Sequence, residues 1–416
     1  MTQTELTAGI HDCACGRDHD CPIKAIRIGA NALQSLPEVL DGYRHILLVA
    51  DDNTDAVCGE QVREQLGDTV EATLILHADG VVVPDETCIA EIEAKLTADT
   101  DMLVGIGSGI INDLCKDVSF RHGLPYGIVA TAPSMDGYAS VGAALILGGM
   151  KVTRNARPPM VIVADTAVLK TAPLDMLKAG YGDIVGKYSC LNDWKLSTAI
   201  YGEYFCQTVY DLTMDTAKAV EPLAERILGR DEQAIGLLME ALVTVGIAMS
   251  YVGNSRPASG SEHHLSHFFE ITGILEGSPY FAHGIDVLYS AVVTARLREK
   301  LLHSTPHRKA FDRAAWEAEI HRVYSTSADG VIALQNKLGW YERDDESAVI
   351  PQWEALCNIL REAPTEKEMK GLVQRIGLDY DEFLTTYGEA KLADAVKYAK
   401  DLKDRYSVLW LYHQYA

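Results

Sequence analysis

The sequence predicts an α/β protein in which a doubly wound parallel sheet domain, over residues 1–171, is followed by an all-helical domain over residues 172–416. In the first part, short runs rich in β-branched residues alternate with helix-like stretches, as in sheets built from strand–helix–strand units. After about Thr171 such runs become rare and apolar residues recur at helical spacing. A chain of 416 residues also exceeds one ordinary hydrophobic core, so two domains are expected.

The expected buried strands lie at residues 24–29, 45–50, 72–77, 102–106, 126–130 and 160–164. Helices are expected between them, at 30–40, 54–66, 85–96 and 110–122. Residues 143–147 and 151–153, joined by Gly148 and Gly149, indicate a β-hairpin appended to the sheet. In the second part the helical pattern covers 212–228, 231–252, 262–275, 285–302 and much of 314–415.

The composition narrows the class of function. The formal net charge is −22, and so acidic a surface repels phosphate backbones and anionic lipid, so we expect no nucleic-acid or membrane partner. The longest apolar run, around 241–252, is shorter than the roughly 18–20 residues of a bilayer span. The first residues carry no secretory signal, and nine scattered cysteines are typical of reduced thiols. A cytoplasmic protein is expected.

Five potential metal ligands cluster near the N-terminus, in the segment HDCACGRDHDC: His11, Cys13, Cys15, His19 and Cys21. A zinc knuckle can be built from such residues. The cysteine spacing matches no strong zinc pattern, so the alternative is an ordinary N-terminal turn.

A glycine-rich segment, Gly105-Ile106-Gly107-Ser108-Gly109, follows an expected strand and opens an expected helix. Glycines let a backbone approach a pyrophosphate, and a helix N-terminus offers N–H groups and partial positive charge. The spacing is one residue short of the usual dinucleotide fingerprint. The alternative is a tight turn between strand and helix.

Two further segments lie at the carboxyl ends of expected strands, where ligands bind such sheets. Asp51 either hydrogen-bonds an adenosine ribose, which favours NAD over NADP, or helps begin the next helix, with Asn53 or Thr54 as the cap. The segment TAPSMDGYAS supplies hydroxyl donors and a carboxylate that suit a cofactor and a substrate hydroxyl. These are Thr131, Ser134, Ser140 and Asp136.

A carboxylate and several imidazoles in the second part suggest a metal site. Asp183 lies in AGYGDIVGK, and three histidines lie in SGSEHHLSH, where both His263–His267 and His264–His267 share a helix face. His283 follows, with Gly284 beside it. One carboxylate and two imidazoles suit Zn²⁺, Ni²⁺ or Fe²⁺ and leave positions open for substrate oxygens.

Five segments together resemble the iron-dependent alcohol dehydrogenase superfamily, which includes glycerol dehydrogenase and the dehydroquinate synthases. Within it the chain is more similar to the bacterial sn-glycerol-1-phosphate dehydrogenase family. The segments occur in the same order over roughly residues 20–300: GIGSGIINDLCK, TAPSMDGYASVGAALI, RPPMVIVADTAVLKTAP, AGYGDIVGKYSCLNDWKLS and PASGSEHHLSHFFE with a later HG.

The resemblance implies a dehydroquinate synthase-like fold, with a Rossmann-like sheet domain before a helical domain, and a homodimer. It implies one divalent metal per subunit on Asp183, His263 and His283, with His264 as a neighbour only. It places His267 and Asp183 in catalysis, and Asp136, Asp183 and His267 against the substrate. The implied cofactor is NAD or NADP, bound by Gly107, Ser108, Gly109, Ile110, Ile111, Asn112, Asp113, Thr131, Ala132, Pro133, Ser134 and Ser140, with Asp51 added from its own position.

The implied reaction is the metal-dependent reduction of dihydroxyacetone phosphate to sn-glycerol 1-phosphate and its reverse. A metal acts there as a Lewis acid, the nicotinamide carries the hydride, and His267 relays a proton. The alternatives are a glycerol or other polyol dehydrogenase, a dehydroquinate synthase-like lyase, and a nucleotide-binding module without catalysis. Cations for the substrate phosphate are sought among residues that are otherwise surface charges: Lys151, Arg154, Arg157 and Lys187.

Overall fold

In the computed structural model, which describes residues 1–148 and 150–416, the chain divides into two compact units. Unit 1 comprises Met1–Ile184 and Pro222–Ser255, and unit 2 comprises Val185–Glu221 and Arg256–Ala416. The expected boundary after residue 171 therefore leaves out most of α8 (Leu174–Val185) and all of α12 (Glu232–Val252), which cluster with the sheet.

Unit 1 contains a parallel sheet with the strand order β1-β8-β5-β4-β2-β3. All of the expected strands are present: β1 (Ala25–Gly29), β2 (Ile46–Asp51), β3 (Val70–Leu76), β4 (Met102–Gly107), β5 (Tyr126–Ala130) and β8 (Val161–Asp165). The central strands are buried along their whole length, because helices cover both faces of a doubly wound sheet. Their near-continuous apolar sequences follow from this burial.

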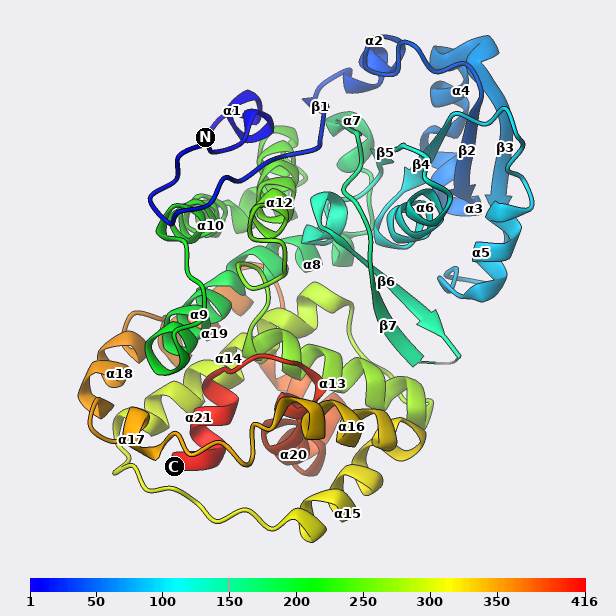
Figure 1. Ribbon diagram of the computed structural model, residues 1–416. Helices are drawn as coiled ribbons and strands as arrows, with labels where there is room; N and C mark the ends of the chain where they lie inside the picture. Colours follow the sequence, from blue (N-terminus) through cyan, green and yellow to red (C-terminus); the bar gives the residue numbers. More distant parts are fainter. Residues whose placement is uncertain (149) are drawn as a thin grey trace. The chain divides into compact units, whose positions relative to one another are not determined.

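Two hydrophobic clusters lie on the opposite faces of this sheet. On one face the strands pack against η1 (Ala32–Ser35), α2 (Leu36–Val39) and α4 (Glu60–Leu66). On the other they pack against α5 (Glu86–Glu93) and α6 (Gly109–His122), and Figure 1 shows these strands and helices in blue and cyan. The single helix expected at 54–66 is divided into α3 (Asp52–Thr54), a π-helical turn η2 (Asp55–Gly59) and α4.

The expected hairpin is present as β6 (Gly142–Leu147) and β7 (Met150–Asn155), but it forms a two-stranded sheet of its own. Gly149, in its turn, lies outside the described residues. The hairpin is attached through backbone donors: the Ala144 N–H donates to Asp113 Oδ2 (3.0 Å) and the Ile146 N–H to the Pro84 carbonyl (2.9 Å). The hairpin is therefore appended to the sheet domain by these hydrogen bonds and adds no strand to the main sheet.

Helix α12 is the core helix of unit 1. Within the described residues it is the one helix long and apolar enough to cross a membrane by length and composition, and 78% of its most apolar window is buried inside the protein. It packs against β1, α7 (Thr166–Leu169) and the turn η4 (Asp136–Ala139). Its apolar surface is thus used in packing within the unit.

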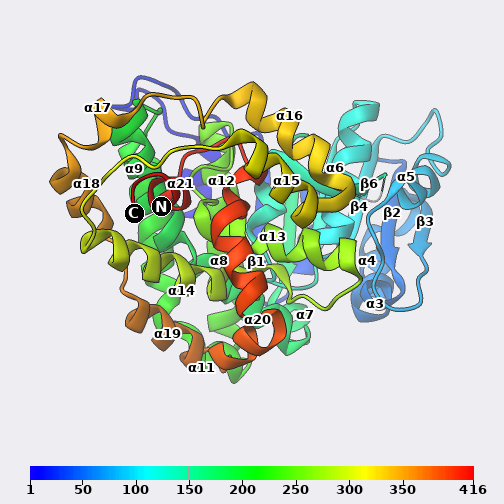
Figure 2. The ribbon, with the colours of Figure 1, turned by 90° about the horizontal axis from the view of Figure 1, so that it is seen from below.

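Unit 2 is helical in its described residues. In Figure 2, α14 (His283–Leu302) runs beside α13 (Ser261–Glu276), and it also contacts α19 (Glu366–Arg375) and α21 (Val408–Tyr415). The helix expected at 212–228 is divided by η5 (Glu221–Leu223) at the unit boundary. The other helices are α9 (Lys187–Tyr201), α10 (Gln207–Val220), α15 (Arg313–Tyr324), α16 (Ala328–Leu338), α17 (Glu346–Val349), α18 (Trp353–Leu360) and α20 (Tyr380–Tyr398), with α1 (Gln3–Ala8) and α11 (Ala224–Leu228) in unit 1.

A substitution at Gly180 tests how closely α8 packs on the loop that follows β5. A Cβ at this residue would lie 1.9 Å from the Pro133 carbonyl oxygen, so the backbone would have to move. We expect Gly180→Ala to lower the free energy of unfolding by about 1–3 kcal/mol, as overpacking does. Urea denaturation measures the change.

Gly371→Ala, within α19, is the matched control for Gly180→Ala. Nothing lies within 4 Å of a Cβ at Gly371, and alanine is favoured over glycine inside a helix by about 1 kcal/mol. This variant should be stabilised. If both variants were stabilised equally, the close packing of α8 on the loop would be contradicted.

Candidate active site

The glycine-rich segment forms the turn between β4 and α6. Ser108 is the N-cap residue of α6, and its side chain makes no capping hydrogen bond. The Ser108 side chain therefore does not compete with an anion for the N–H groups of the first turn of α6. Ile110, in this turn, is half-buried. Binding of a dinucleotide pyrophosphate at this turn stays a prediction.

The two glycines of this turn have different reasons to lack a side chain. A Cβ at Gly107 would lie 2.6 Å from the Ile111 side chain, so Gly107 is required by the packing of α6 on β4. A Cβ at Gly109 would meet only the flexible end of Met135, at 3.3 Å. Internal packing explains Gly107, whereas Gly109 leaves space at the start of the helix that a ligand can use.

Asp51 is the N-cap of the short helix α3, in a reciprocal capping box. Its Oδ1 accepts from the Thr54 N–H (2.8 Å), and the Thr54 hydroxyl oxygen accepts from the Asp51 N–H (3.0 Å). The capping alternative is thus present in the structure, with Asp51 itself as the cap in place of Asn53 or Thr54. A carboxylate can cap with one oxygen and bind a ribose with the other, so the ribose contact stays a prediction.

The loop after β5 is joined to the glycine-rich turn, because the Thr131 N–H donates to the Gly107 carbonyl (3.1 Å). Thr131, Ala132 and Pro133 are buried, and Ser134 is half-buried. The Tyr138 hydroxyl donates to the Ala132 carbonyl (2.6 Å) and holds the loop from within. The residues expected to bind the cofactor thus share one edge of the sheet.

Lys116 is a residue that the sequence did not single out. Its buried ammonium donates to the Gly137 and Gly142 carbonyls (2.7 and 3.0 Å) and to Ser140 Oγ (3.2 Å), and it lies 3.5 Å from Asp113. Burial lowers the pKa of Lys116 and raises that of Asp113. The pair fixes the second half of the loop.

This network also uses three residues that were expected to bind the cofactor. Asn112 is buried and donates to Asp113 Oδ1 (3.1 Å), Asp113 Oδ2 accepts from Ala144, and the Ser140 hydroxyl donates to the Gly137 carbonyl (3.0 Å). Their observed hydrogen bonds shape the loop. Direct contact with a cofactor stays a prediction for each of them.

Asp183 and Asp136 meet through the backbone. Asp183, on α8, is fully buried, and its Oδ2 accepts from the Asp136 N–H (2.9 Å). Gly180 lets α8 approach the same loop, and Gly246 of α12 does so from another side, since a Cβ there would lie 2.8 Å from the Asp136 carbonyl oxygen. The Asp183 carboxylate and the Asp136 backbone are therefore held in fixed positions at the loop.

Within unit 2, three of the expected histidines face one another. The ring centroids of His263 and His283 are 5.1 Å apart, those of His267 and His283 are 5.5 Å apart, and those of His263 and His267 are 6.2 Å apart. His264 is not among them: it is fully buried, and burial lowers its pKa well below the usual value, so its ring is neutral. Of the two possible helical pairs, the structure brings His263 and His267 beside His283.

Glu262 orients the first of these histidines, a role that the sequence did not reveal. His263 Nδ1 donates to Glu262 Oε1 (2.7 Å), and the Gly260 N–H donates to the same oxygen (2.8 Å). Burial alone raises the pKa of Glu262, but the hydrogen bond and charge of His263 outweigh it, so the pKa lies below its usual value. A carboxylate on one ring nitrogen leaves the other nitrogen as a metal ligand, a common arrangement at metal-binding histidines.

Asp193, on α9, positions the start of α13. Its Oδ2 accepts from the Ser261 N–H (2.7 Å), and its Oδ1 from the Val408 N–H (2.9 Å) at the start of α21. Arg298 of α14, also buried, donates to Oδ1 (3.2 Å). A Cβ at Gly260 would lie 2.6 Å from Cys190 Cα, so α13 begins in close contact with α9.

The four cations considered for a phosphate are not equivalent. Arg154 pairs with Asp117 (3.2 Å), and Arg157 lies over the Phe120 ring at 5.4 Å. Lys151 is half-buried, whereas Lys187, the first residue of α9, is fully buried. Only Lys187 among them is a buried positive charge.

Comparison with known proteins gives a consistent family. Residues 27–173 match the family model described as iron-containing alcohol dehydrogenase. A glycerol-1-phosphate dehydrogenase [NAD(P)+] of Halalkalibacterium halodurans is 37% identical over 69% of this chain and 73% of the relative. One of Bacillus licheniformis is 30% identical over 97% of this chain and 92% of the relative. The chain belongs to the glycerol-1-phosphate dehydrogenase family.

The solved structures agree on the fold. An iron-containing alcohol dehydrogenase from Thermococcus thioreducens superposes with a TM-score of 0.62 over 94% of this chain and 97% of that chain, at 15% sequence identity. At that identity the likeness shows the fold alone. The expected dehydroquinate synthase-like arrangement, a Rossmann-like sheet followed by helices, is confirmed at this level.

Asp51→Ser separates the two roles of Asp51, because serine also caps helices well but carries no charge. If the carboxylate faces the ribose, it repels the 2′-phosphate of NADPH locally. We expect Asp51→Ser to raise the NADPH-to-NADH ratio of kcat/KM about ten-fold, the equivalent of about 1.4 kcal/mol.

Asp52→Ser is the control, since Asp52 is the exposed neighbouring carboxylate and contacts His77 (2.8 Å). It should leave the ratio unchanged. An equal change in both variants, or none in Asp51→Ser, would leave Asp51 with the capping role alone.

Proposed function

We propose that this protein catalyses the reversible, NAD(P)-dependent reduction of dihydroxyacetone phosphate to glycerol 1-phosphate. The observation that supports it most is the family membership, through relatives of that printed name that match most of the chain. In the forward direction one hydride from NAD(P)H and one proton are added to the ketone, giving the secondary alcohol and NAD(P)+.

We also propose that Asp183, His263 and His283 hold one divalent metal ion. One carboxylate and two imidazoles are donors that suit such an ion. The donor set fits, because His263 is held by a carboxylate at Nδ1 and Asp183 by a backbone N–H. When bound, Zn²⁺, Ni²⁺ or Fe²⁺ supplies Lewis acidity at the reacting oxygen.

The remaining residues then have distinct tasks. His267, half-buried beside His283, passes the proton between the substrate oxygen and solvent. Asp136 and Asp183 accept hydrogen bonds from substrate hydroxyls. The first turn of α6 binds the cofactor pyrophosphate, while the loop 131–140 holds the nicotinamide side of the cofactor.

Lys187 is our candidate for the phosphate subsite, because it is the one fully buried cation among the four considered. We further propose a homodimer, as the family resemblance implies, and a cytoplasmic location. None of the nine cysteines, all of which lie in the described chain, forms a disulfide.

His264, adjacent to His263, provides a control for the proposed metal ligands. His263→Ala and His283→Ala each remove one ligand, so we expect loss of most bound metal and of nearly all turnover, while circular dichroism stays that of a folded protein. His264→Ala should keep both, because His264 is outside the proposed set. Metal content by mass spectrometry measures the result, and a loss of metal in His264→Ala alone would mean that the ligands are assigned one residue out.

The reaction is tested with metal-depleted enzyme resupplied with Zn²⁺, Ni²⁺ or Fe²⁺. We expect dihydroxyacetone phosphate to oxidise NADH or NADPH and dihydroxyacetone to be a poor substrate. The product should resist glycerol-3-phosphate-specific oxidation, which identifies the 1-phosphate enantiomer. Lys187→Gln should raise the KM for dihydroxyacetone phosphate but not that for dihydroxyacetone, whereas Arg157→Gln should change neither.

Equal turnover of dihydroxyacetone and its phosphate would identify a polyol dehydrogenase instead. Substrate turnover without net change in NADH would identify a lyase that regenerates its cofactor. Cofactor binding without any turnover would leave a nucleotide-binding protein. Each of these outcomes contradicts the proposal.

A further inference from the structure

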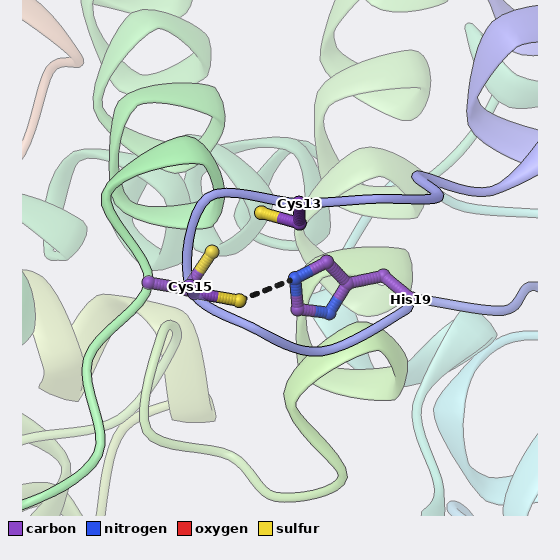
Figure 3. Close-up of side chains that lie close together, drawn as sticks. Cys13, Cys15 and His19 are labelled. Atoms are coloured by element: carbon purple, nitrogen blue, oxygen red, sulfur yellow. Dashed lines mark hydrogen bonds between the residues drawn. The ribbon is translucent and has the colours of Figure 1, made fainter.

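The segment between α1 and β1 folds back on itself at the N-terminus of unit 1. Ile10 and His19 form an antiparallel bridge, with N–H to carbonyl distances of 2.9 Å in both directions. Between them the Gly16 N–H donates to the Cys13 carbonyl (2.9 Å), and Gly16 has a φ of +81°, which favours glycine. The bridge and this turn bring Cys13 and Cys15 beside the His19 ring, as Figure 3 shows.

His19 is oriented as a metal-binding histidine is. It is fully buried, and its Nδ1 donates to the Tyr251 carbonyl on α12 (2.9 Å), which fixes the tautomer. Its Nε2 faces Cys15 Sγ at 3.3 Å, and Cys13 Sγ lies within 4.8 Å of a His19 ring nitrogen and of Cys15 Sγ. Two sulfur atoms and one unprotonated ring nitrogen therefore point at one place.

Few residues of this segment are buried. Among residues 10–20 only Cys13 and His19 are buried, so apolar burial fixes the loop poorly. Small segments of this kind are commonly held by a metal or a disulfide. None of the nine cysteines, each among the described residues, forms a disulfide, so the linkage that suits this segment is a metal.

We propose that Cys13, Cys15 and His19 bind a structural zinc ion. Cys13 and His19 are buried, and Cys15 is half-buried. Two thiolates and one imidazole are donors that suit tetrahedral Zn²⁺. The site stabilises the fold and takes no part in the redox reaction.

The chemistry of the two sets distinguishes this ion from the one in the active site. Soft thiolates favour Zn²⁺, whereas the Asp183 set is made of oxygen and nitrogen donors. Binding deprotonates the thiols, so the released protons go to solvent and the metal affinity falls with acid. Cys21 and His11, although close in sequence, lie outside the set.

The test uses untagged protein purified without chelators, in the His263→Ala/His283→Ala background, so that the active-site metal does not contribute. We expect about one zinc ion per chain in this background. Adding Cys13→Ser, Cys15→Ser or His19→Ala should reduce zinc to background. The added control Cys21→Ser should keep it.

X-ray absorption of the wild-type protein loaded with zinc alone provides a readout that needs no variant to fold. Zinc–sulfur distances of about 2.3 Å are expected from this site, beside the nitrogen and oxygen neighbours of the active-site metal. A spectrum with only nitrogen and oxygen neighbours, zinc retained when Cys13 and Cys15 are both serine, or a Cys13–Cys15 disulfide in the purified protein would each overturn the proposal.

Discussion

The buried carboxylate of Asp193 sets the geometry on which unit 2 depends. It caps the first residues of α13 and α21, and Arg298 of α14 neutralises it. Four helices, α9 included, thus meet at one side chain. Removing one partner of such a pair typically costs about 3–5 kcal/mol, because the other charge stays buried.

The same pair determines where the histidines point. His263 and His267 lie on α13, whose start is held by Asp193, and His283 opens α14, which carries Arg298. A shift at the pair would rotate both helices and separate the rings. The buried pair of Asp193 and Arg298 therefore holds the helices of unit 2 in place, as the parallel sheet holds the helices of unit 1.

Much of the fold could be predicted from the sequence, because buried parallel strands are nearly continuous apolar runs. Helices α8 and α9 could not be outlined in the same way. α9 is buried on most sides and carries Lys187, Asn192 and Asp193 at buried positions, so no polar face marks it as a helix. The hairpin was expected from its turn, but whether it joined the main sheet depended on backbone partners at Pro84 and Asp113.

The candidate site likewise contains residues that the sequence revealed and residues that it did not. The histidines were visible because spacing along a helix is a local property. Glu262, Lys116 and Asp193 were not, since each acts through partners that only folding brings close. At the N-terminus the sequence offered five potential ligands, and the register of the Ile10–His19 bridge selects among them.

The discontinuity of unit 1 has a consequence for synthesis of the chain. The sheet is complete when Asp165 has been made, but its core helix α12 is encoded only after residues 185–221 of the other unit. While residues 185–221 leave the ribosome, the apolar surface of unit 1 that packs against α12 therefore stays uncovered. Helix α12 then emerges as a segment apolar enough to attract membranes or chaperones. The nascent protein is most exposed to aggregation in that interval, which ends when Val252 reaches the sheet.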